Sequence, residues 1–288
     1  KPFFLYMPFT SPHWPLQAPA EAIAKYKGRY DGGWDKIRET RRARMIEMGI
    51  ISEEWPLTER DSDVPAWDDA PNKEWEARRM EVYAAQITIM DETIGRFVGH
   101  LRESGQLDNT LIFFLADNGG CAEELSNSWA DALFFPEKTL DGTRDVLHDN
   151  DPSIMPGPEE TYQSYGLRWA NASNTPFRLY KHYVHEGGIA SPLIVHWPAK
   201  LKNPGTWTDQ QGHLVDIMAS SLDAADAEYP SEYNGNAITP LEGKSLLPTV
   251  TEGAAVEREA IYWEHEGNRA IRAGKWKLVS KWSEPENN

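Results

Sequence analysis

The 288-residue sequence predicts an α/β fold, in which helices sandwich a mostly parallel mixed sheet and a small antiparallel subdomain begins near the carboxyl end. One observation is a long helical pattern between two short apolar runs, which is typical of a parallel βαβ unit. Another is a series of short segments after residue 260, separated by turn residues, which is typical of antiparallel hairpins. We therefore expect residues 1–252 to form part of an α/β domain and residues 253–288 to start a truncated antiparallel subdomain.

The first elements are a strand, a loop and helical stretches. The apolar run at residues 3–7 predicts a buried strand, and a proline-rich loop follows at residues 10–19. Residues 20–50 are expected to be helical in parts, because apolar side chains recur there at steps of three and four. Residues 53–72 are acidic and contain proline, so we predict a surface loop.

The clearest element is a helix over residues 73–104, which we expect Gly105 to end. Its apolar positions alternate in steps of three and four, as one face of a helix requires, and they are Met80, Tyr83, Ile87, Met90, Ile94, Phe97 and Leu101. Residues 111–116 then form a continuous apolar run, which is typical of a strand buried on both faces.

The second half of the chain has weaker patterns. Residues 119–176 lack periodicity, and we predict a long ordered excursion because the segment carries several aromatic residues, Phe134, Phe135, Tyr162, Tyr165 and Trp169. Residues 191–197 predict another buried strand. Residues 212–227 predict a helix whose core face is Leu214, Ile217, Met218 and Leu222. Short antiparallel strands are predicted at residues 260–264, 269–272 and 276–279.

Composition and charge exclude several classes of protein. The chain has 29 Lys and Arg against 45 Asp and Glu, a net charge of −16, which argues against nucleic acid as the partner. No apolar run approaches the roughly 20 residues of a membrane-spanning helix. The single cysteine, Cys121, excludes an internal disulfide framework and a CxxC metal site.

Asp117 and Asn118 directly follow the predicted strand at residues 111–116. In open α/β sheets, ligands bind beyond the carboxyl ends of the strands. Carboxylate and amide oxygens are hard ligands suited to Ca²⁺ or Mg²⁺. The sequence therefore indicates either a metal site or a tight Asp-Asn-Gly-Gly turn with no further role.

His13 and Lys181 are further candidates, because His13 follows a predicted core strand and Lys181 precedes a Glu-Gly-Gly turn and another such strand. His13 could donate a hydrogen bond to an anionic oxygen or act as an acid or base, and Lys181 could bind an anionic group near a glycine turn. The alternatives are a loop histidine bonded to the backbone and a solvated lysine. Cys121 has no nearby base in the sequence, which indicates a structural residue.

Three stretches together resemble the arylsulfatases. KPFFLYMPFTSPHWPLQAP at residues 1–19 is similar to the segment in which a strand delivers an active-site histidine, and DNTLIFFLADNG at residues 108–119 is similar to the strand that ends in two metal ligands. Residues 165–198 resemble the stretch in which a lysine precedes a Glu-Gly-Gly turn and a buried strand. The resemblance covers nearly the whole chain, and it is to bacterial type I, formylglycine-dependent arylsulfatases of the alkaline phosphatase superfamily.

The resemblance implies that a sulfate ester is hydrolysed at a site that holds a divalent cation, usually Ca²⁺, with Mg²⁺ as an alternative. By match, Asp117 and Asn118 would be metal ligands, and Asp117 could help to activate the nucleophile. His13 and Lys181 would contact the sulfate and stabilise charge on it or on the leaving oxygen. The implied substrate is a small-molecule or glycan sulfate ester, and the implied location is periplasmic or secreted.

The sequence departs from the family pattern because it lacks the nucleophile. In the family, the nucleophile is the hydrate of an oxidised Cys or Ser in a Cys/Ser-x-Pro-x-Arg motif, whereas Cys121 is followed by neither the Pro nor the Arg. The family's amino-terminal acidic pair and its Lys-x-His are also absent. We therefore expect the formylglycine in a missing amino-terminal portion of the same protein, and we expect residues 1–288 alone not to turn over substrate.

Two other functions remain open from the sequence. A phosphate or phosphonate monoester hydrolase of the same superfamily would carry similar residues, since the esters differ mainly in charge. A non-catalytic homologue could instead bind sulfated glycans in a tryptophan-rich crevice.

Overall fold

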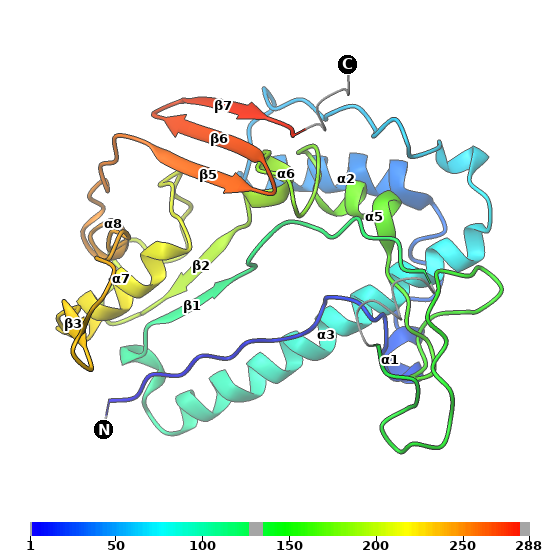
Figure 1. The fold of residues 1–288 in the computed structure, drawn as a ribbon, viewed down its shortest axis with the longest axis horizontal. Helices are drawn as coiled ribbons and strands as arrows, with labels where there is room; N and C mark the ends of the chain where they lie inside the picture. The colour runs from blue at the N-terminus through cyan, green and yellow to red at the C-terminus, as the bar shows by residue number, and fades with distance from the viewer. Residues whose placement is uncertain (1, 127–134, 283–288) are drawn as a thin grey trace. The chain divides into compact units, whose positions relative to one another are not determined.

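The chain combines helices with short antiparallel sheets, as Figure 1 shows for the computed structural model, which describes residues 2–126 and 135–282. The helices are α1 (Ala20–Ala24), α2 (Gly33–Glu47), α3 (Lys73–Glu103), α5 (Gly166–Ser173), α6 (Glu186–Ile189), α7 (Val215–Ala224) and α8 (Leu247–Glu252). The strands are β1 (Ile112–Leu115), β2 (Leu193–His196), β3 (Glu232–Tyr233), β4 (Asn236–Ala237), β5 (Ile261–His265), β6 (Asn268–Ala273) and β7 (Trp276–Ser280). The predicted α/β class is confirmed.

The chain divides into two compact units. The first contains Lys1–Phe97 and Asn118–Ala190, and the second contains Val98–Asp117 and Ser191–Asn288. Within residues 2–126 and 135–282, the strands β1 to β7 lie in the second unit, whereas α1, α2, α5, α6 and most of α3 lie in the first. The predicted domain boundary at residue 253 stays a prediction.

The helical predictions for the amino-terminal part are confirmed. The stretch from 20 to 50 contains α1 and α2, and the predicted long helix is α3, which ends at Glu103. Gly105 follows with a φ of 71°, the left-handed conformation in which glycine avoids the Cβ clash of other residues. Among the described helices, none is both long and apolar enough to cross a membrane.

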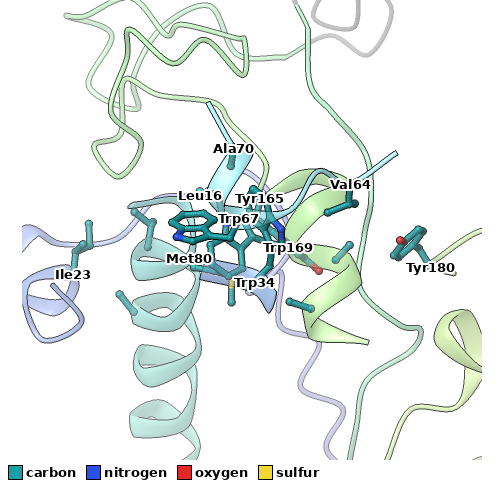
Figure 2. Packing of buried hydrophobic residues seen from close by; sticks show 14 of the residues in the cluster. Leu16, Ile23, Trp34, Val64, Trp67, Ala70, Met80, Tyr165, Trp169 and Tyr180 are labelled. Atoms are coloured by element: carbon teal, nitrogen blue, oxygen red, sulfur yellow. The ribbon is translucent and has the colours of Figure 1, made fainter. Parts of the chain in front are cut away.

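Three tryptophans form the centre of the first unit's core (Figure 2). The ring centroid of Trp34 lies 4.7 Å from that of Trp67 and 5.6 Å from that of Trp169, in edge-to-face arrangements. Each such aromatic pair contributes about 0.5–1.5 kcal/mol beyond its buried area. Trp169 lies on α5, so this core orders part of the predicted excursion at residues 119–176. Phe134, another aromatic residue of that prediction, lies outside the described residues.

The predicted surface loop at residues 53–72 is wrong in part, because Val64, Trp67 and Ala70 are buried. The backbone N–H of Trp67 donates to Asp35 Oδ2 at 2.8 Å, and its indole donates to the carbonyl of Asp31 at 3.0 Å. The acidic residues on which the surface-loop prediction was based flank these three apolar residues, which pack on the core.

The predicted buried strand at residues 3–7 is also wrong. No strand is assigned to residues 2–10, and Phe4 and Tyr6 are 80% and 76% exposed. An apolar run becomes a buried strand only when another element pairs with it and covers it. Within the residues that the structure describes, this run has neither.

β1 and β2 confirm the predicted strands at residues 111–116 and 191–197, but their pairing differs from the prediction. They pair antiparallel, with Ile112 opposite His196 and Leu115 opposite Leu193. Each pairing among β1–β7 is antiparallel, so the mostly parallel sheet does not form among the described strands. Burial on both faces is also wrong, since Phe114 is 41% exposed and Ile194 is 57% exposed. The apolar run indicated a strand but carried no information on its direction.

The helix predicted at residues 212–227 is α7, but its buried face differs from the prediction. Leu214 and Met218 are about half exposed, whereas Asp216 and Ser220 are fully buried. The Asp216 carboxylate accepts from the backbone N–H of Lys244 at 2.9 Å and pairs with Arg258. This buried polar network, which periodicity does not reveal, determines the orientation of the helix.

The predicted carboxyl-terminal hairpins are confirmed. β5 pairs antiparallel with β6, and β6 pairs antiparallel with β7. The β3–β4 hairpin is an additional element that the sequence analysis did not predict.

Candidate active site

Two glycine turns in the first unit pack backbone against backbone. The N–H of Gly119 donates to the carbonyl of Gly188 at 2.9 Å. A Cβ on Gly119 would lie 1.8 Å from the Gly187 carbonyl oxygen, and a Cβ on Gly187 would lie 2.1 Å from the Leu179 carbonyl oxygen. Only residues without a side chain allow this approach, so the two turns depend on each other.

Asn174 and Lys181 link the same two segments. Asn174 Oδ1 accepts from the N–H of Gly120 at 2.8 Å, and its Nδ2 donates to the carbonyl of Leu179 at 2.8 Å. The backbone N–H of Lys181 donates to the carbonyl of Gly120 at 3.1 Å. The backbone that carries Lys181 is therefore bonded directly to the turn that follows Asn118.

The structure brings His13 and Lys181 together across 168 positions of sequence, with 3.4 Å between His13 Nε2 and Lys181 Nζ. His13 Nδ1 lies 2.9 Å from the carbonyl oxygen of Trp14. Because a carbonyl only accepts, we assign the proton to Nδ1, which leaves Nε2 to accept from the ammonium in the neutral imidazole. His13 therefore makes both a hydrogen bond to the backbone, which was the alternative prediction for a loop histidine, and a contact with Lys181.

Glu123, which the sequence analysis did not select, receives four hydrogen bonds. Lys181 Nζ and His182 Nε2 donate to Oε1 at 3.1 Å and 3.0 Å. Trp14 Nε1 and Cys121 Sγ donate to Oε2 at 2.6 Å and 3.0 Å. Burial acts to raise the pKa of this carboxyl, but the hydrogen bonds outweigh burial and lower the pKa to about 2.

Cys121 is buried, and burial together with the hydrogen bond to Glu123 raises the pKa of its thiol to about 12. The expectation that no base lies near Cys121 is wrong, since the carboxylate of Glu123 is in contact with it. The thiol is nevertheless protonated at neutral pH, and only a thiolate is an effective nucleophile.

Asp117 and Asn118 lie just beyond β1, after Ala116, but they are assigned to different units, Asp117 to the second and Asn118 to the first. Asp117 is exposed and Asn118 is half-buried, and neither side chain takes part in a hydrogen bond or ion pair within the described residues. Their oxygens are of the type that a hard divalent cation prefers. Both residues thus fit the predicted metal site in chemical character, and their role as ligands stays a prediction.

A second group of possible metal ligands consists of His13, Cys121 and Glu123, whose ligand atoms lie within 4.8 Å of one another. The ammonium of Lys181 already pairs with Glu123 in this group. The group also combines nitrogen and sulfur with a single carboxylate, whereas Ca²⁺ takes oxygen ligands. The fit to calcium therefore rests on Asp117 and Asn118.

The backbone around Lys181 adopts an uncommon conformation. Leu179 and His182 have φ values of 65° and 79°, in the left-handed region that bulky residues rarely occupy. Such residues cluster at functional sites, where the surrounding structure holds them in place. Glu123 and His182 were missed because their significance lies in contacts between segments that are distant in the sequence, and no motif marks either residue.

An ammonium and an imidazole held side by side define a site that suits an anionic group. The family model described as Sulfatase matches residues 1–227, and the chain belongs to this family. The predicted membership of the sulfatases is therefore confirmed.

The relatives of the chain agree with this membership. An uncharacterized sulfatase of Schizosaccharomyces pombe is 35% identical over 283 residues, which is 96% of this chain and 49% of the relative. The arylsulfatase of Klebsiella aerogenes is 34% identical over 251 residues, which is 85% of this chain and 51% of the relative. The N-acetylgalactosamine-6-sulfatase of Sus scrofa is 25% identical over 207 residues, which is 70% of this chain and 30% of the relative. The chain thus spans about half the length of the first two relatives.

A solved structure shares the fold. The crystal structure of Ps i-CgsB in complex with k-i-k-neocarrahexaose has a TM-score of 0.51 and 20% identity, and the match covers 94% of this chain and 39% of that chain.

Proposed function

We propose that the protein hydrolyses sulfate monoesters. The observation that carries this proposal is the contact between Lys181 Nζ and His13 Nε2, in a chain that belongs to the sulfatase family. The names of relatives include an arylsulfatase and an N-acetylgalactosamine-6-sulfatase. These names support an aryl or glycan sulfate ester as the substrate.

Lys181 and His13 have complementary roles in this proposal. An ammonium has three N–H donors, of which one is directed to Glu123 and one to His13, so a third can meet a sulfate oxygen. His13 Nε2 accepts from Lys181 only in the neutral imidazole. When His13 is protonated at Nε2, this N–H donates instead to the sulfate or to the oxygen that leaves with the alcohol, and the N–H of Lys181 that faced it is released for the sulfate. Both groups stabilise negative charge that increases as the ester bond breaks.

Asp117 and Asn118 would hold a divalent cation, Ca²⁺ or alternatively Mg²⁺. When bound, the cation would neutralise part of the negative charge on the sulfate oxygens. Because Ca²⁺ takes about six to eight oxygen ligands, we propose that residues outside this chain complete the site. The Cys/Ser-x-Pro-x-Arg motif that carries formylglycine in the family is likewise absent from these 288 residues, and we propose that another part of the full-length protein supplies it.

The test uses the full-length protein with an aryl sulfate and the matching aryl phosphate. We expect a higher kcat/KM for the sulfate, loss of activity after treatment with a chelator, and recovery when Ca²⁺ or Mg²⁺ is added. A preference for the phosphate would show a phosphoester hydrolase instead. Binding of a sulfated glycan without any turnover would show a binding protein.

The same assay tests the site residues. Lys181→Ala is expected to lower kcat/KM for the aryl sulfate by about 100- to 1,000-fold, the usual effect of removing one donor to a developing negative charge. Lys202→Ala is the control, because the Lys202 ammonium donates to the carbonyl of Glu252 in the second unit. Equal effects of the two substitutions would overturn the assignment of Lys181.

A further inference from the structure

Glu123 joins three segments of the first unit that are distant in sequence. It accepts from four donors. Trp14 lies in the same segment as His13, Cys121 follows the glycine turn, and Lys181 and His182 are neighbours in the third segment. A carboxylate has about four lone-pair positions, so these donors use its full accepting capacity. With its side chain only 14% exposed, Glu123 has no position left with which to bind a substrate.

Lys181 is a flexible residue that these contacts hold at both ends. A lysine side chain carries about 2 kcal/mol of rotamer entropy, so an isolated ammonium samples many positions. The backbone of Lys181 is bonded to Gly120, and its Nζ is bonded to Glu123 and lies beside His13 Nε2. The hydrogen bond from His182 to the same carboxylate oxygen holds the residue that follows Lys181.

We propose that Glu123 is a positioning residue, which holds the Lys181 ammonium beside His13 so that both groups meet the sulfate of the ester together. This inference rests on the proposed function. Glu123 does not contact the substrate, and its effect is transmitted through Lys181. The pairing also cancels the carboxylate charge, which alone would repel an anionic substrate.

The test is a double-mutant cycle in the full-length protein, with Glu123→Gln, Lys181→Ala and the double variant. Gln keeps the size of the side chain, but its NH₂ group cannot accept the hydrogen bonds made to one carboxylate oxygen. We expect Glu123→Gln to lower kcat/KM for an aryl sulfate by about 100-fold, the effect of a misplaced reacting group, and by less than about threefold once Lys181 is Ala. Equal losses in both backgrounds would show that Glu123 supports the fold only, and would overturn the inference.

A matched control is Glu92→Gln, since Glu92 forms an exposed pair with Lys25 at 3.4 Å. We expect it to change kcat/KM by less than about twofold, because exposed pairs contribute little. If Glu123→Gln does not fold, Glu123→Asp takes its place in the cycle. Asp keeps the charge but is shorter by one methylene, and an undiminished kcat/KM in this variant would also overturn the inference.

Binding of inorganic sulfate, measured by calorimetry on the same variants, separates this inference from the proposed function. Weaker sulfate binding in Glu123→Gln, seen only while Lys181 is present, would support the positioning role even if no ester were hydrolysed. In that case only the proposed function would fail. A full-length protein that binds no sulfate, or binds it equally well after Glu123→Gln, would overturn the positioning role.

Discussion

Glu123 should give the fold a specific dependence on pH. Burial acts to raise the pKa of this carboxyl, but hydrogen bonds from Cys121, His182, Trp14 and Lys181 lower it from its ordinary value of 4.5 to about 2. The folded protein therefore favours the ionised form more than the unfolded chain does. The difference between the folded and unfolded pKa of this carboxyl corresponds to about 3 kcal/mol of unfolding free energy at neutral pH. This contribution is complete above the unfolded pKa and is lost as the pH falls toward the folded pKa, with about 2 kcal/mol lost at pH 3.

The assay is denaturant unfolding of the full-length protein and its Glu123→Gln variant at pH 7 and pH 3. We expect the difference in unfolding free energy between the two proteins to shrink by about 2 kcal/mol on going from pH 7 to pH 3. Glu92→Gln is the control, and its difference should stay below about 1 kcal/mol at both pH values, as for other exposed pairs. A difference for Glu123→Gln that is the same at both pH values would refute the reasoning, because the carboxylate would then be no more ionised in the folded state.

Three further predictions concern stability and reactivity. Asp216→Asn should lower the unfolding free energy by about 3–5 kcal/mol, because it leaves the largely buried Arg258 without its charged partner; a loss no larger than that of Met218→Ala, on the exposed side of α7, would contradict the buried network. Trp169→Ala should cost about 3–5 kcal/mol in the same measurement, and a loss below about 1 kcal/mol would contradict the tryptophan core. Cys121, buried and with a thiol pKa of about 12, should resist maleimide at neutral pH in the folded protein and react after unfolding, as followed by mass spectrometry; rapid labelling of the folded protein would contradict this protonation state.

Local patterns predicted the helices better than the sheets. The position of α3 follows from its steps of three and four, because one apolar face must be covered whatever element covers it. The direction of β1 relative to β2 depends on the path of the 77 residues between them, 116–192 in the sequence, and apolar content does not encode that path. Residues 3–7 show the same limit. Their composition suits a strand, but it does not specify a second strand that would pair with them.

Sequence motifs predicted only part of the candidate site. Taken one at a time, His13 and Lys181 each had an ordinary structural explanation, and the resemblance to sulfatases assigned both to one site. The structure places His13 Nε2 and Lys181 Nζ 3.4 Å apart. Glu123 carries no motif of its own, and its hydrogen-bond partners lie up to 109 positions away. Such a residue is visible only in three dimensions, since what distinguishes it from the neighbouring Glu124 is the set of donors that meet it.

The contacts of Glu123 also change how an acidic chain is expected to bind an anionic ester. A chain with a net charge of −16 repels an anionic ester unless the site itself offers positive potential or oriented donors. In the structure, the Glu123 carboxylate pairs with the Lys181 ammonium, and the imidazoles of His13 and His182 are charged only when protonated. For the proposed sulfate ester, this arrangement would act through the direction of its N–H donors more than through excess positive charge. Oriented donors stabilise the transition state most when they need no rearrangement, which is why the group that holds Lys181 in place matters as much as the charge that Lys181 carries.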